Sequence, residues 1–238
     1  MANVNTLIDG ASKLDMDLDK AQIEKFVLYK VLLQEWNQKI NITSIIDDEE
    51  IDIKHFLDSI IPFKTELFKN NIKVIDIGTG GGFPGIPLKI INESLDMVLL
   101  DSTNKKIRFL EEVIEKLELN NISPIHGRAE ELGRTEEHRE RYDIAISRAV
   151  ASLDTLSEYA LPFVNLGGHF ISMKGPDVEE ELEEGKRAIE TLGGKIKAIE
   201  KIQIPDTDIV HSLIIIEKIK RTPTKYPRAG GKPKKQPL

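Results

Sequence analysis

The stretch KVIDIGTGGGFPGIPL, residues 73–88, changes within a few positions from an apolar run to a segment rich in glycine and proline. Residues 73–77 are predicted to form a buried strand, because β-branched side chains dominate a short run that glycine ends. The glycines that follow can take positive φ and let the backbone approach a ligand closely. A helix that begins near Pro84 tolerates both prolines, since the first N–H groups of a helix have no partner within it. The stretch therefore predicts a strand, a glycine turn and a helix start.

This arrangement favours a nucleotide-like ligand, because the free N–H groups of a helix start attract anionic or polar groups. The pattern alone is not specific. A glycine-rich connection without a ligand has the same composition, and a dinucleotide and S-adenosylmethionine share it as ligands. Counted from Gly78, the dinucleotide spacing G-x-G-x-x-G fails at Phe83, yet the register that starts at Gly80 matches it. The glycine spacing therefore leaves both ligands open.

The composition indicates a soluble globular protein. The chain has 238 residues, of which 40% are hydrophobic and 31% charged, so it can bury a sizeable core. No apolar run approaches the roughly 20 residues of a membrane span, and the N-terminus lacks a basic segment followed by an apolar one. We therefore expect a cytoplasmic protein that has no contact with a membrane.

Several classes of chemistry are excluded by residue type. The absence of cysteine excludes disulfides, thiolate zinc sites and a cysteine nucleophile. The five histidines show no metal-ligand spacing, so we expect no metal, and no G-x-S-x-G nucleophile turn occurs.

The net charge of −7 conceals an asymmetry. Residues 218–238 contain eight basic side chains and no acidic one, whereas the rest of the chain is acidic. Clustered Lys and Arg favour contact with a phosphate backbone even when the net charge is unfavourable. The alternative is a solvated, frayed terminus, and composition leaves both open.

The N-terminal part is predicted to be helical. Asp19 can cap a first long helix, and a second helix begins near Asp47 or Asp48, with acidic residues in its first turn. His55 and Asp58 lie three positions apart on the second helix, and we expect them to form a hydrogen-bonded pair.

The remainder alternates between strands and helices, as βαβ units do. We predict strands at 73–77, 96–101, 122–126, 143–147, 168–173, 195–204 and 211–219. The last two are joined by a turn too short for a crossover, so they must form an antiparallel hairpin. The fold class is therefore α/β, a seven-stranded mixed sheet with one reversed strand. We divide the chain into an N-terminal helical region packed on the core (1–70), a ligand-binding domain (71–220) and a basic tail (221–238).

In such a sheet the ligand lies beyond the carboxyl ends of the strands. Asp101 ends the second strand 23 residues after Gly78, where a carboxylate can accept both ribose hydroxyls of either ligand. From this placement we also expect cofactor contacts at Thr79, Gly80 and Ser102. The reversed strand favours S-adenosylmethionine, because a final antiparallel hairpin on seven strands is the usual plan of methyltransferases that use it. For Lys174, after strand five, a solvated lysine and an RNA phosphate contact both stay open.

Seven motifs together resemble one bacterial family. They are VIDIGTGGGFPGIPL (74–88), LLDS (99–102), GRAEEL (127–132), SRAVA (147–151), WN-x-x-IN-x-T (36–43), H-x-x-DS (55–59) and TP-x-x-YPR-x-x-G-x-P-x-K-x-PL (222–238). The chain resembles the small-subunit ribosomal RNA methyltransferase G family, also called glucose-inhibited division protein B, over nearly its whole length.

The resemblance implies a Rossmann-like class I methyltransferase that methylates N7 of one guanine in 16S ribosomal RNA near the decoding region. The donor would be S-adenosyl-L-methionine and the product S-adenosyl-L-homocysteine. Carried over by motif, the family's cofactor contacts fall on Gly78, Phe83, Ala129, Glu130 and Arg148. The partner would be 16S ribosomal RNA or a precursor of the small subunit, and we expect a monomer. RNA contacts are expected at Lys174, Arg228, Lys232, Lys234 and Lys235.

The chemistry agrees with the residue inventory. Guanine N7 carries an available lone pair, so no general base is needed and we assign none. Catalysis is expected to depend on the positioning of the two reactants, and the positive charge of Arg148 or Lys174 near the pocket could assist it electrostatically. Carbon-5 methylation of pyrimidines usually needs cysteine, which is absent. Two alternatives stay open: a small-molecule methyltransferase, and a non-catalytic protein that binds S-adenosylmethionine or RNA.

Overall fold

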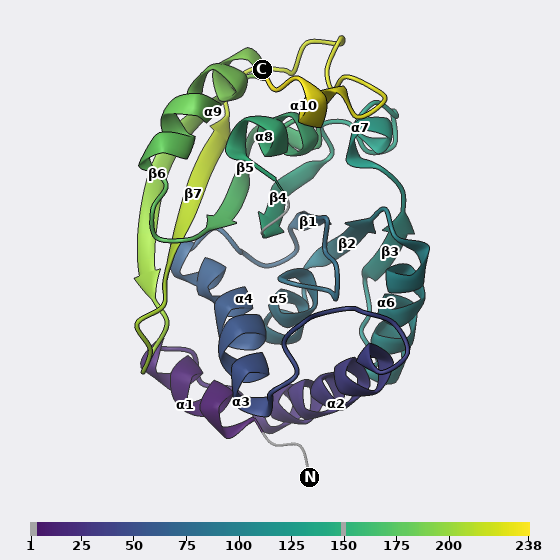
Figure 1. The fold of residues 1–238 in the computed structure, drawn as a ribbon, viewed down its shortest axis with the longest axis vertical. Coiled ribbons are helices and arrows are strands. Elements are labelled where there is room, and N and C mark those ends of the chain that lie inside the picture. Colours follow the sequence, from purple (N-terminus) through teal and green to yellow (C-terminus); the bar gives the residue numbers. More distant parts are fainter. Residues whose placement is uncertain (1–3, 149–150) are drawn as a thin grey trace.

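A seven-stranded sheet in the order β3-β2-β1-β4-β5-β7-β6 forms the centre of the fold (Figure 1). The structure is a computed structural model and describes residues 4–148 and 151–238. The strands are β1 (Lys73–Ile77), β2 (Asp96–Asp101), β3 (Ile122–His126), β4 (Tyr142–Arg148), β5 (Val164–Lys174), β6 (Gly194–Gln203) and β7 (Val210–Lys218). β1 to β5 pair in parallel, whereas β7 is antiparallel to both of its neighbours. The predicted mixed sheet with one reversed strand is confirmed.

The helices cover both faces of the sheet (Figure 1). They are α1 (Asn5–Lys13), α2 (Lys20–Asn37), α3 (Asp48–Ile51), the π-helix η1 (Asp52–Leu57), α4 (Asp58–Ile60), the 3-10 helix η2 (Ile61–Thr65), α5 (Gly85–Ile91), α6 (Asn104–Lys116), α7 (Ala129–Leu132), α8 (Leu153–Ala160), α9 (Glu179–Thr191) and α10 (Lys232–Lys235). One core packs the helices up to α6 against the sheet, and a second packs α8 and α9 against its other face.

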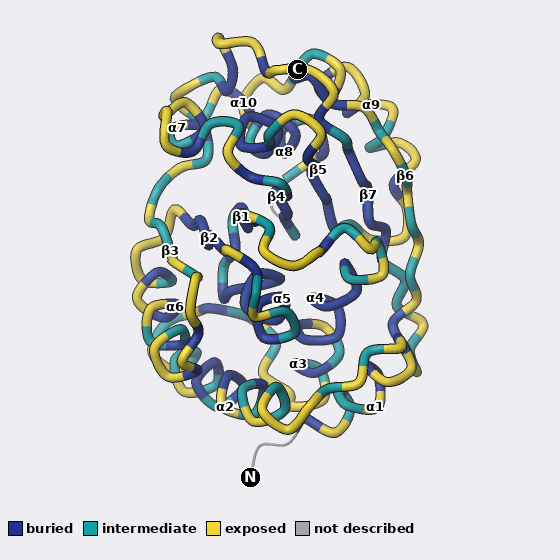
Figure 2. The backbone as a smooth tube through the Cα atoms, turned by 180° about the vertical axis from the view of Figure 1, so that it is seen from behind, coloured by how far each residue is buried: buried dark blue, intermediate teal, exposed yellow. Residues whose placement is uncertain are grey.

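The N-terminal helices begin where the sequence predicts. Asp19 caps α2 in a reciprocal capping box with Gln22. The Asp47 side chain caps α3, because it accepts from the N–H groups of Glu49 and Glu50. Side chains of α1 and α2 share one continuous apolar core with β1 and α5. Figure 2 shows this buried interior as dark tube in the sheet and on the inner sides of the helices. The N-terminal helices are therefore part of the same folded body as the sheet.

The C-terminal tail is docked rather than frayed. The Arg139 guanidinium donates to the carbonyls of Thr222 and Tyr226, at 2.7 and 2.8 Å. Arg228 forms an ion pair with the buried carboxylate of Glu158 at 2.6 Å. Because these contacts tie the tail to α8 and to the segment after α7, the solvated-terminus alternative is wrong for residues 222–228.

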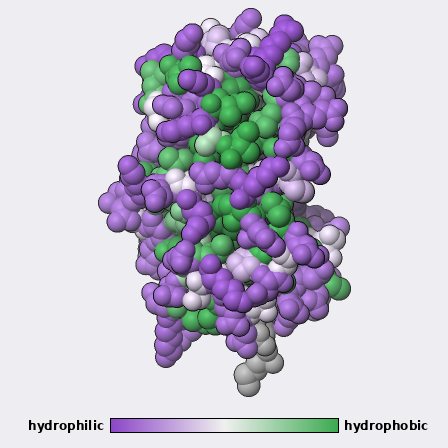
Figure 3. Space-filling model, turned by 90° about the vertical axis from the view of Figure 1, so that its left-hand side faces the viewer, coloured by the Kyte–Doolittle hydropathy of each residue, from purple (hydrophilic) through white to green (hydrophobic). Residues whose placement is uncertain are grey.

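The face that carries the edge strand β6 is mostly hydrophilic with apolar groups between (Figure 3). Ile199 of β6 is 42% exposed. Exposed lysines at positions 195, 197 and 201 alternate along the same strand. Charged side chains on an edge strand oppose pairing with a further strand, so this edge is protected.

Candidate functional site

The glycine turn after β1 has the conformation that its composition predicts. Gly78, Gly80 and Gly82 have positive φ of 71°, 61° and 95°. A Cβ at Gly82 would lie 2.7 Å from the Tyr29 hydroxyl, so α2 closes one side of the turn. A Cβ at Gly80 would meet nothing nearer than the Lys106 amine at 3.7 Å. The backbone at Gly80 is therefore the accessible part of the turn.

Asp76 organises the turn from within. Its Oδ2 accepts from the Thr79 hydroxyl at 2.6 Å and from the Gly85 N–H at 2.9 Å. Burial raises the pKa of Asp76 to about 6, although these hydrogen bonds oppose the shift. Its Oδ1 is buried and has no hydrogen-bond partner among the described residues. An unsatisfied buried carboxylate oxygen is uncommon and costly, so it marks a place where a donor is missing.

The Asp76 carboxylate also occupies an N–H group at the start of α5 that is expected to be free for a ligand. The sequence predicts free N–H groups there, but the Gly85 N–H is already bound by Asp76 and the Ile86 N–H by the Gly82 carbonyl. A pyrophosphate would have to displace a negatively charged side chain from this position. The geometry therefore disfavours a dinucleotide, which the glycine spacing leaves open.

Asp101 joins β2 to the turn. Its Oδ2 accepts from the Gly80 N–H at 2.9 Å and its Oδ1 from the Thr103 N–H at 2.8 Å. Each carboxylate oxygen keeps a second lone pair, so the group can still accept a ligand hydroxyl. Ser102 beside it is exposed. Asp101 is thus placed both to support the turn and to face a ligand on it.

The loop after β3 lies next to Asp101. The Gly127 N–H donates to the Asp101 carbonyl at 3.1 Å, and α7 follows at once. Ala129 opens this short helix, and Glu130 is 4% exposed with the Arg128 guanidinium 3.4 Å away. The turn after β1, the end of β2 and the loop after β3 are therefore brought together.

Phe83 faces the N-terminal helices. Its ring stacks on His55 with centroids 4.3 Å apart, and on Tyr29 at 5.5 Å. The guanidinium carbon of Arg148, at the end of β4, lies 5.1 Å from the ring centroid. Because the ring is enclosed between these side chains, the backbone is the part of Phe83 that remains for a cofactor.

Arg148 connects β4 to η1 and α4. It forms an ion pair with Asp58 at 2.5 Å and donates to Nδ1 of His55 at 3.2 Å. Asp58 also bonds His211, the second residue of β7. The predicted direct pair between His55 and Asp58 is wrong, since Arg148 stands between them and bonds both.

Lys174, at the end of β5, is engaged within the chain. Its amine donates to the Ala151 carbonyl and to Glu181, both at 2.6 Å, and its side chain is 12% exposed. The solvated-lysine alternative is therefore wrong. A phosphate contact would require the amine to exchange these partners.

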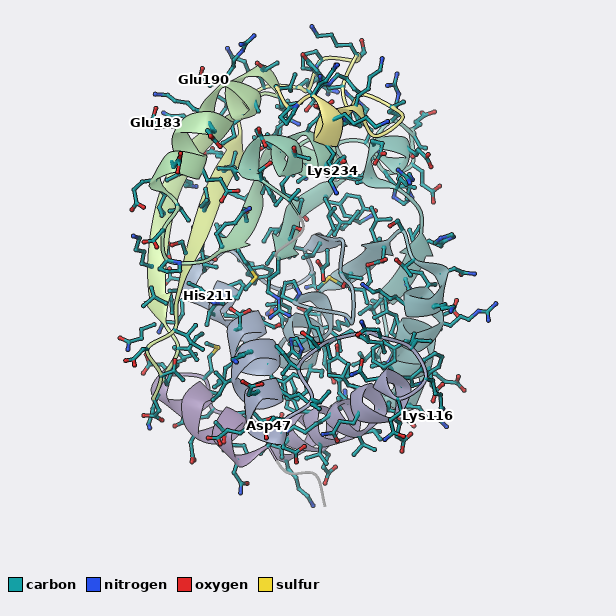
Figure 4. All side chains as sticks on the ribbon, in the orientation of Figure 1. Asp47, Lys116, Glu183, Glu190, His211 and Lys234 are labelled. Atoms are coloured by element: carbon teal, nitrogen blue, oxygen red, sulfur yellow. The ribbon has the colours of Figure 1, made fainter. Side chains whose placement is uncertain are left out.

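The tail residues expected to contact RNA lie on α10, which packs beside α8, and just before it. Lys232, Lys234 and Lys235 are exposed on α10, whereas the Arg228 guanidinium is held by Glu158. Figure 4 labels Lys234, a residue of α10, and His211, next to α4, at separate places in the view. Ala149 and Val150 of the SRAVA motif lie outside the described residues.

Two structural features are absent from the described part of the chain. No helix there is long and apolar enough to cross a membrane. No group of three or more His, Asp or Glu side chains within 4–148 and 151–238 is arranged to hold a metal ion.

Three residues of the site are absent from the sequence-based list of cofactor and RNA contacts. Asp76 has a local signal, since an acidic residue just before the glycine turn can reach back to the helix start. The contact between Asp58 and His211 has none, because it joins positions 153 residues apart.

Comparisons with known proteins point to one family. The GidB family, described as rRNA small subunit methyltransferase G, matches residues 22–210. A protein named Ribosomal RNA small subunit methyltransferase G from Clostridium tetani is 49% identical over 238 residues, which is 100% of both chains. One of the same name from Acetivibrio thermocellus is 54% identical over 232 residues, 98% of this chain and 95% of that one.

Solved structures share the fold at lower identity. TYW2 from M. jannaschii, in complex with AdoMet, superposes with a TM-score of 0.53 and 22% identity, covering 68% of this chain and 77% of that one. The Methanococcus jannaschii fibrillarin pre-rRNA processing protein gives 0.50 and 20%, covering 64% and 69%.

Proposed function

The chain belongs to the rRNA small subunit methyltransferase G family, and from this premise we propose that it methylates N7 of one guanine in 16S ribosomal RNA near the decoding region, with S-adenosylmethionine as donor. The structural observation that supports the proposal is that the N–H groups of Gly85 and Ile86, at the start of α5, already have hydrogen-bond partners. Asp76 binds the Gly85 N–H, so the turn suits a ligand without phosphate, and the backbone stays open at Gly80.

The residues present fit this cofactor. Asp76 Oδ1 lacks a donor, and the α-ammonium group of S-adenosylmethionine would supply one directly or through a water. The remaining lone pairs of Asp101 would accept the ribose hydroxyls. The predicted contacts at Gly78, Thr79, Gly80, Ser102, Ala129 and Glu130 line the adjoining strand ends. Thr79 would support the turn, because its hydroxyl donates to Asp76 and its N–H donates to the Leu100 carbonyl.

When bound, S-adenosylmethionine would supply an electrophilic methyl group on a sulfonium, with S-adenosylhomocysteine as the leaving product. The chain has to hold guanine N7 in line with that methyl group, and this positioning is what the residues contribute. No proton has to be removed from N7 before attack. His55 does not compete for the role of base: burial, with Arg148 beside it, lowers the pKa of His55 to about 3.

Each of the three regions of the chain has a separate role in this proposal. Residues 1–70 hold the glycine turn through Tyr29 and His55, residues 71–220 bind the cofactor, and residues 221–238 present α10 to RNA. In this proposal Lys232, Lys234 and Lys235 contact phosphates, Arg228 anchors the tail, and Lys174 reaches RNA only after releasing Glu181. The protein acts as a cytoplasmic monomer on 16S RNA or a small-subunit precursor.

Labelled S-adenosylmethionine tests the proposal. The protein is incubated with small ribosomal subunits, or with naked 16S RNA, from cells that lack this chain, and the labelled nucleotide is then identified. We expect label on a single guanine as 7-methylguanosine. Label only on protein or small molecules, or cofactor binding without transfer to RNA, would support one of the two alternative functions instead.

A further inference from the structure

A cavity of about 380 Å³ lies between η1 and α4 and the ends of β4 and β5. Its size is in the range of ligand sites, roughly 300–1,000 Å³. Ile45 and Met173 contribute apolar surface, and Asp58, Arg148 and His211 contribute polar groups. Apolar surface combined with a few convergent polar groups is typical of a small-molecule site.

The reversed strand brings His211 to this place. β7 runs antiparallel to β5, with Ser212 paired to Lys174, so β7 begins at the edge where β5 ends. A parallel strand would present its last residues there instead. His211 consequently lies next to α4 (Figure 4) and lines the cavity.

Asp58 fixes the histidine ring. Its two oxygens are shared between Arg148 and Nδ1 of His211. Burial alone would raise the pKa of Asp58, but the His211 hydrogen bond and the Arg148 charge outweigh it and hold the pKa below its usual value. An ionised carboxylate only accepts, so Nδ1 carries the hydrogen. Nε2 is the ring nitrogen left for a ligand and accepts whenever the ring is neutral, and no described residue in 4–148 or 151–238 bonds it.

The inner wall is equally rigid. Arg148 can only donate, so Nδ1 of His55 accepts, and its Nε2–H donates to the Thr43 hydroxyl 2.8 Å away. The same ring lies 6° from parallel to Phe83. A wall whose side chains are locked by hydrogen bonds and stacking can hold a base in one orientation.

The cavity is distinct from the proposed cofactor site. Of the residues proposed to contact the cofactor, only Arg148 lines it. The turn after β1 reaches the cavity wall only through Phe83, whose ring contacts His55 and Arg148. A ligand in the cavity would therefore lie next to the cofactor without overlapping it, as the second reactant of a transfer must.

We propose that this cavity takes up the target guanine, flipped out of the RNA, and that His211 reads its Watson–Crick edge through Nε2. The inference rests on the proposed function and adds His211 as the residue that distinguishes guanine from adenine. With N7 turned toward the glycine turn, the opposite edge faces His211. Guanine presents an N1–H donor there, whereas adenine presents an N1 lone pair, which an acceptor repels. Asp58 is a positioning residue that acts through His211.

Kinetics on unmodified small subunits test the contact. We expect His211→Ala to lower kcat/KM for RNA by about ten- to hundredfold, the range of one base contact. The dissociation constant for S-adenosylmethionine should stay within about twofold, since His211 does not reach that site. His211→Gln, whose amide oxygen can replace Nε2 as acceptor, should recover part of the loss. His169→Ala, a histidine of β5 that bonds Lys197 instead, is the matched control.

Base analogues separate recognition from a structural effect. RNA is prepared with inosine or 2-aminopurine at the methylated position; both keep N7, but only inosine keeps N1–H. The wild type should prefer inosine, and His211→Ala should lose most of that preference. An unchanged preference in the variant, with its fold and cofactor binding intact, overturns the inference. A wild type that binds no cofactor and methylates no RNA overturns the proposed function instead.

Discussion

Arg148 lies across the ring of Phe83, with its guanidinium carbon 5.1 Å from the ring centroid. The same guanidinium forms an ion pair with Asp58, which is 2% exposed. The end of β4, the glycine turn and α4 are thereby joined at one side chain. Since cofactor and target base are proposed to lie on either side of it, Arg148 sets their separation.

Replacing Arg148 tests this role. Arg148→Met should destabilise the protein by about 3 kcal/mol, because removing one partner of a buried ion pair leaves the other charge uncompensated. It should also weaken cofactor binding and RNA methylation together. Denaturant unfolding and calorimetry measure the two effects. Arg187→Met on α9, an exposed arginine, is the control, and equal behaviour of the two variants would show that Arg148 has no special role.

Asp101 has two functions that a pair of variants can separate. Asp101→Ala removes the acceptor of the Gly80 and Thr103 N–H groups, and S-adenosylmethionine affinity should fall about ten- to hundredfold. Asp101→Asn keeps one acceptor oxygen and should lose less. Calorimetric titration measures both. Unaltered affinity in Asp101→Ala would place the ribose contact elsewhere.

Asp76 predicts a pH dependence of cofactor binding. Its pKa is about 6, so the carboxylate is ionised above that pH and protonated below it. Affinity for S-adenosylmethionine should be constant above about pH 7 and fall as the pH drops through about 6, because the protonated group no longer attracts an ammonium. Asp76→Asn should bind weakly and show little of this dependence. A wild-type affinity that stays flat down to about pH 5 would contradict the assignment.

Protonation of Asp76 does not itself unfold the protein. A carboxyl whose pKa is raised on folding contributes stability that is present below its unfolded pKa and lost as the pH rises through the folded value. Asp76, shifted from 3.8 to about 6, therefore stabilises the fold at low pH. A thermal melt at each pH verifies that the protein remains folded where affinity falls.

The sequence predicts what depends on local pattern. The strand and turn at 73–88 follow from β-branched residues and glycine, and the reversed strand follows from the short connection before β7. The Asp19 cap is equally local. These features need only neighbouring residues, so they can be inferred without knowing the tertiary structure.

The contacts that define the site are mostly nonlocal. His211 meets Asp58 across 153 residues, and nothing near either one signals it. The expected pair of His55 and Asp58 fails for the same reason, since Arg148 arrives from β4 and separates them. Arg228 belongs to a basic tail in the sequence, but only the fold shows that Glu158 holds it.

The ion pair between Arg228 and Glu158 can be tested by limited proteolysis. Glu158 is fully buried and accepts from the backbone and the guanidinium of Arg228. Arg228→Ala should leave this carboxylate unpaired and release the tail, so that proteolysis after residue 221 becomes faster. Lys225→Ala, which loses only a contact with the Tyr226 ring, should not have this effect. Resistance of Arg228→Ala to limited proteolysis would show that other contacts suffice to hold the tail.

The lysines of α10 can be tested apart from that anchor. Lys232, Lys234 and Lys235 are exposed. Each lysine that contacts an RNA phosphate releases a counterion from the RNA when the protein binds. Changing all three to Gln should weaken RNA binding at every sequence and reduce the slope of log affinity against log salt by about 0.7–0.9 per lost contact. The matched control changes Lys195, Lys197 and Lys201 of β6, which are also exposed and carry the same total charge. If α10 is the RNA contact, only the first triple changes the slope, because net charge is altered equally in both. Equal slopes in the two triples would mean that the tail acts through overall charge and makes no phosphate contact.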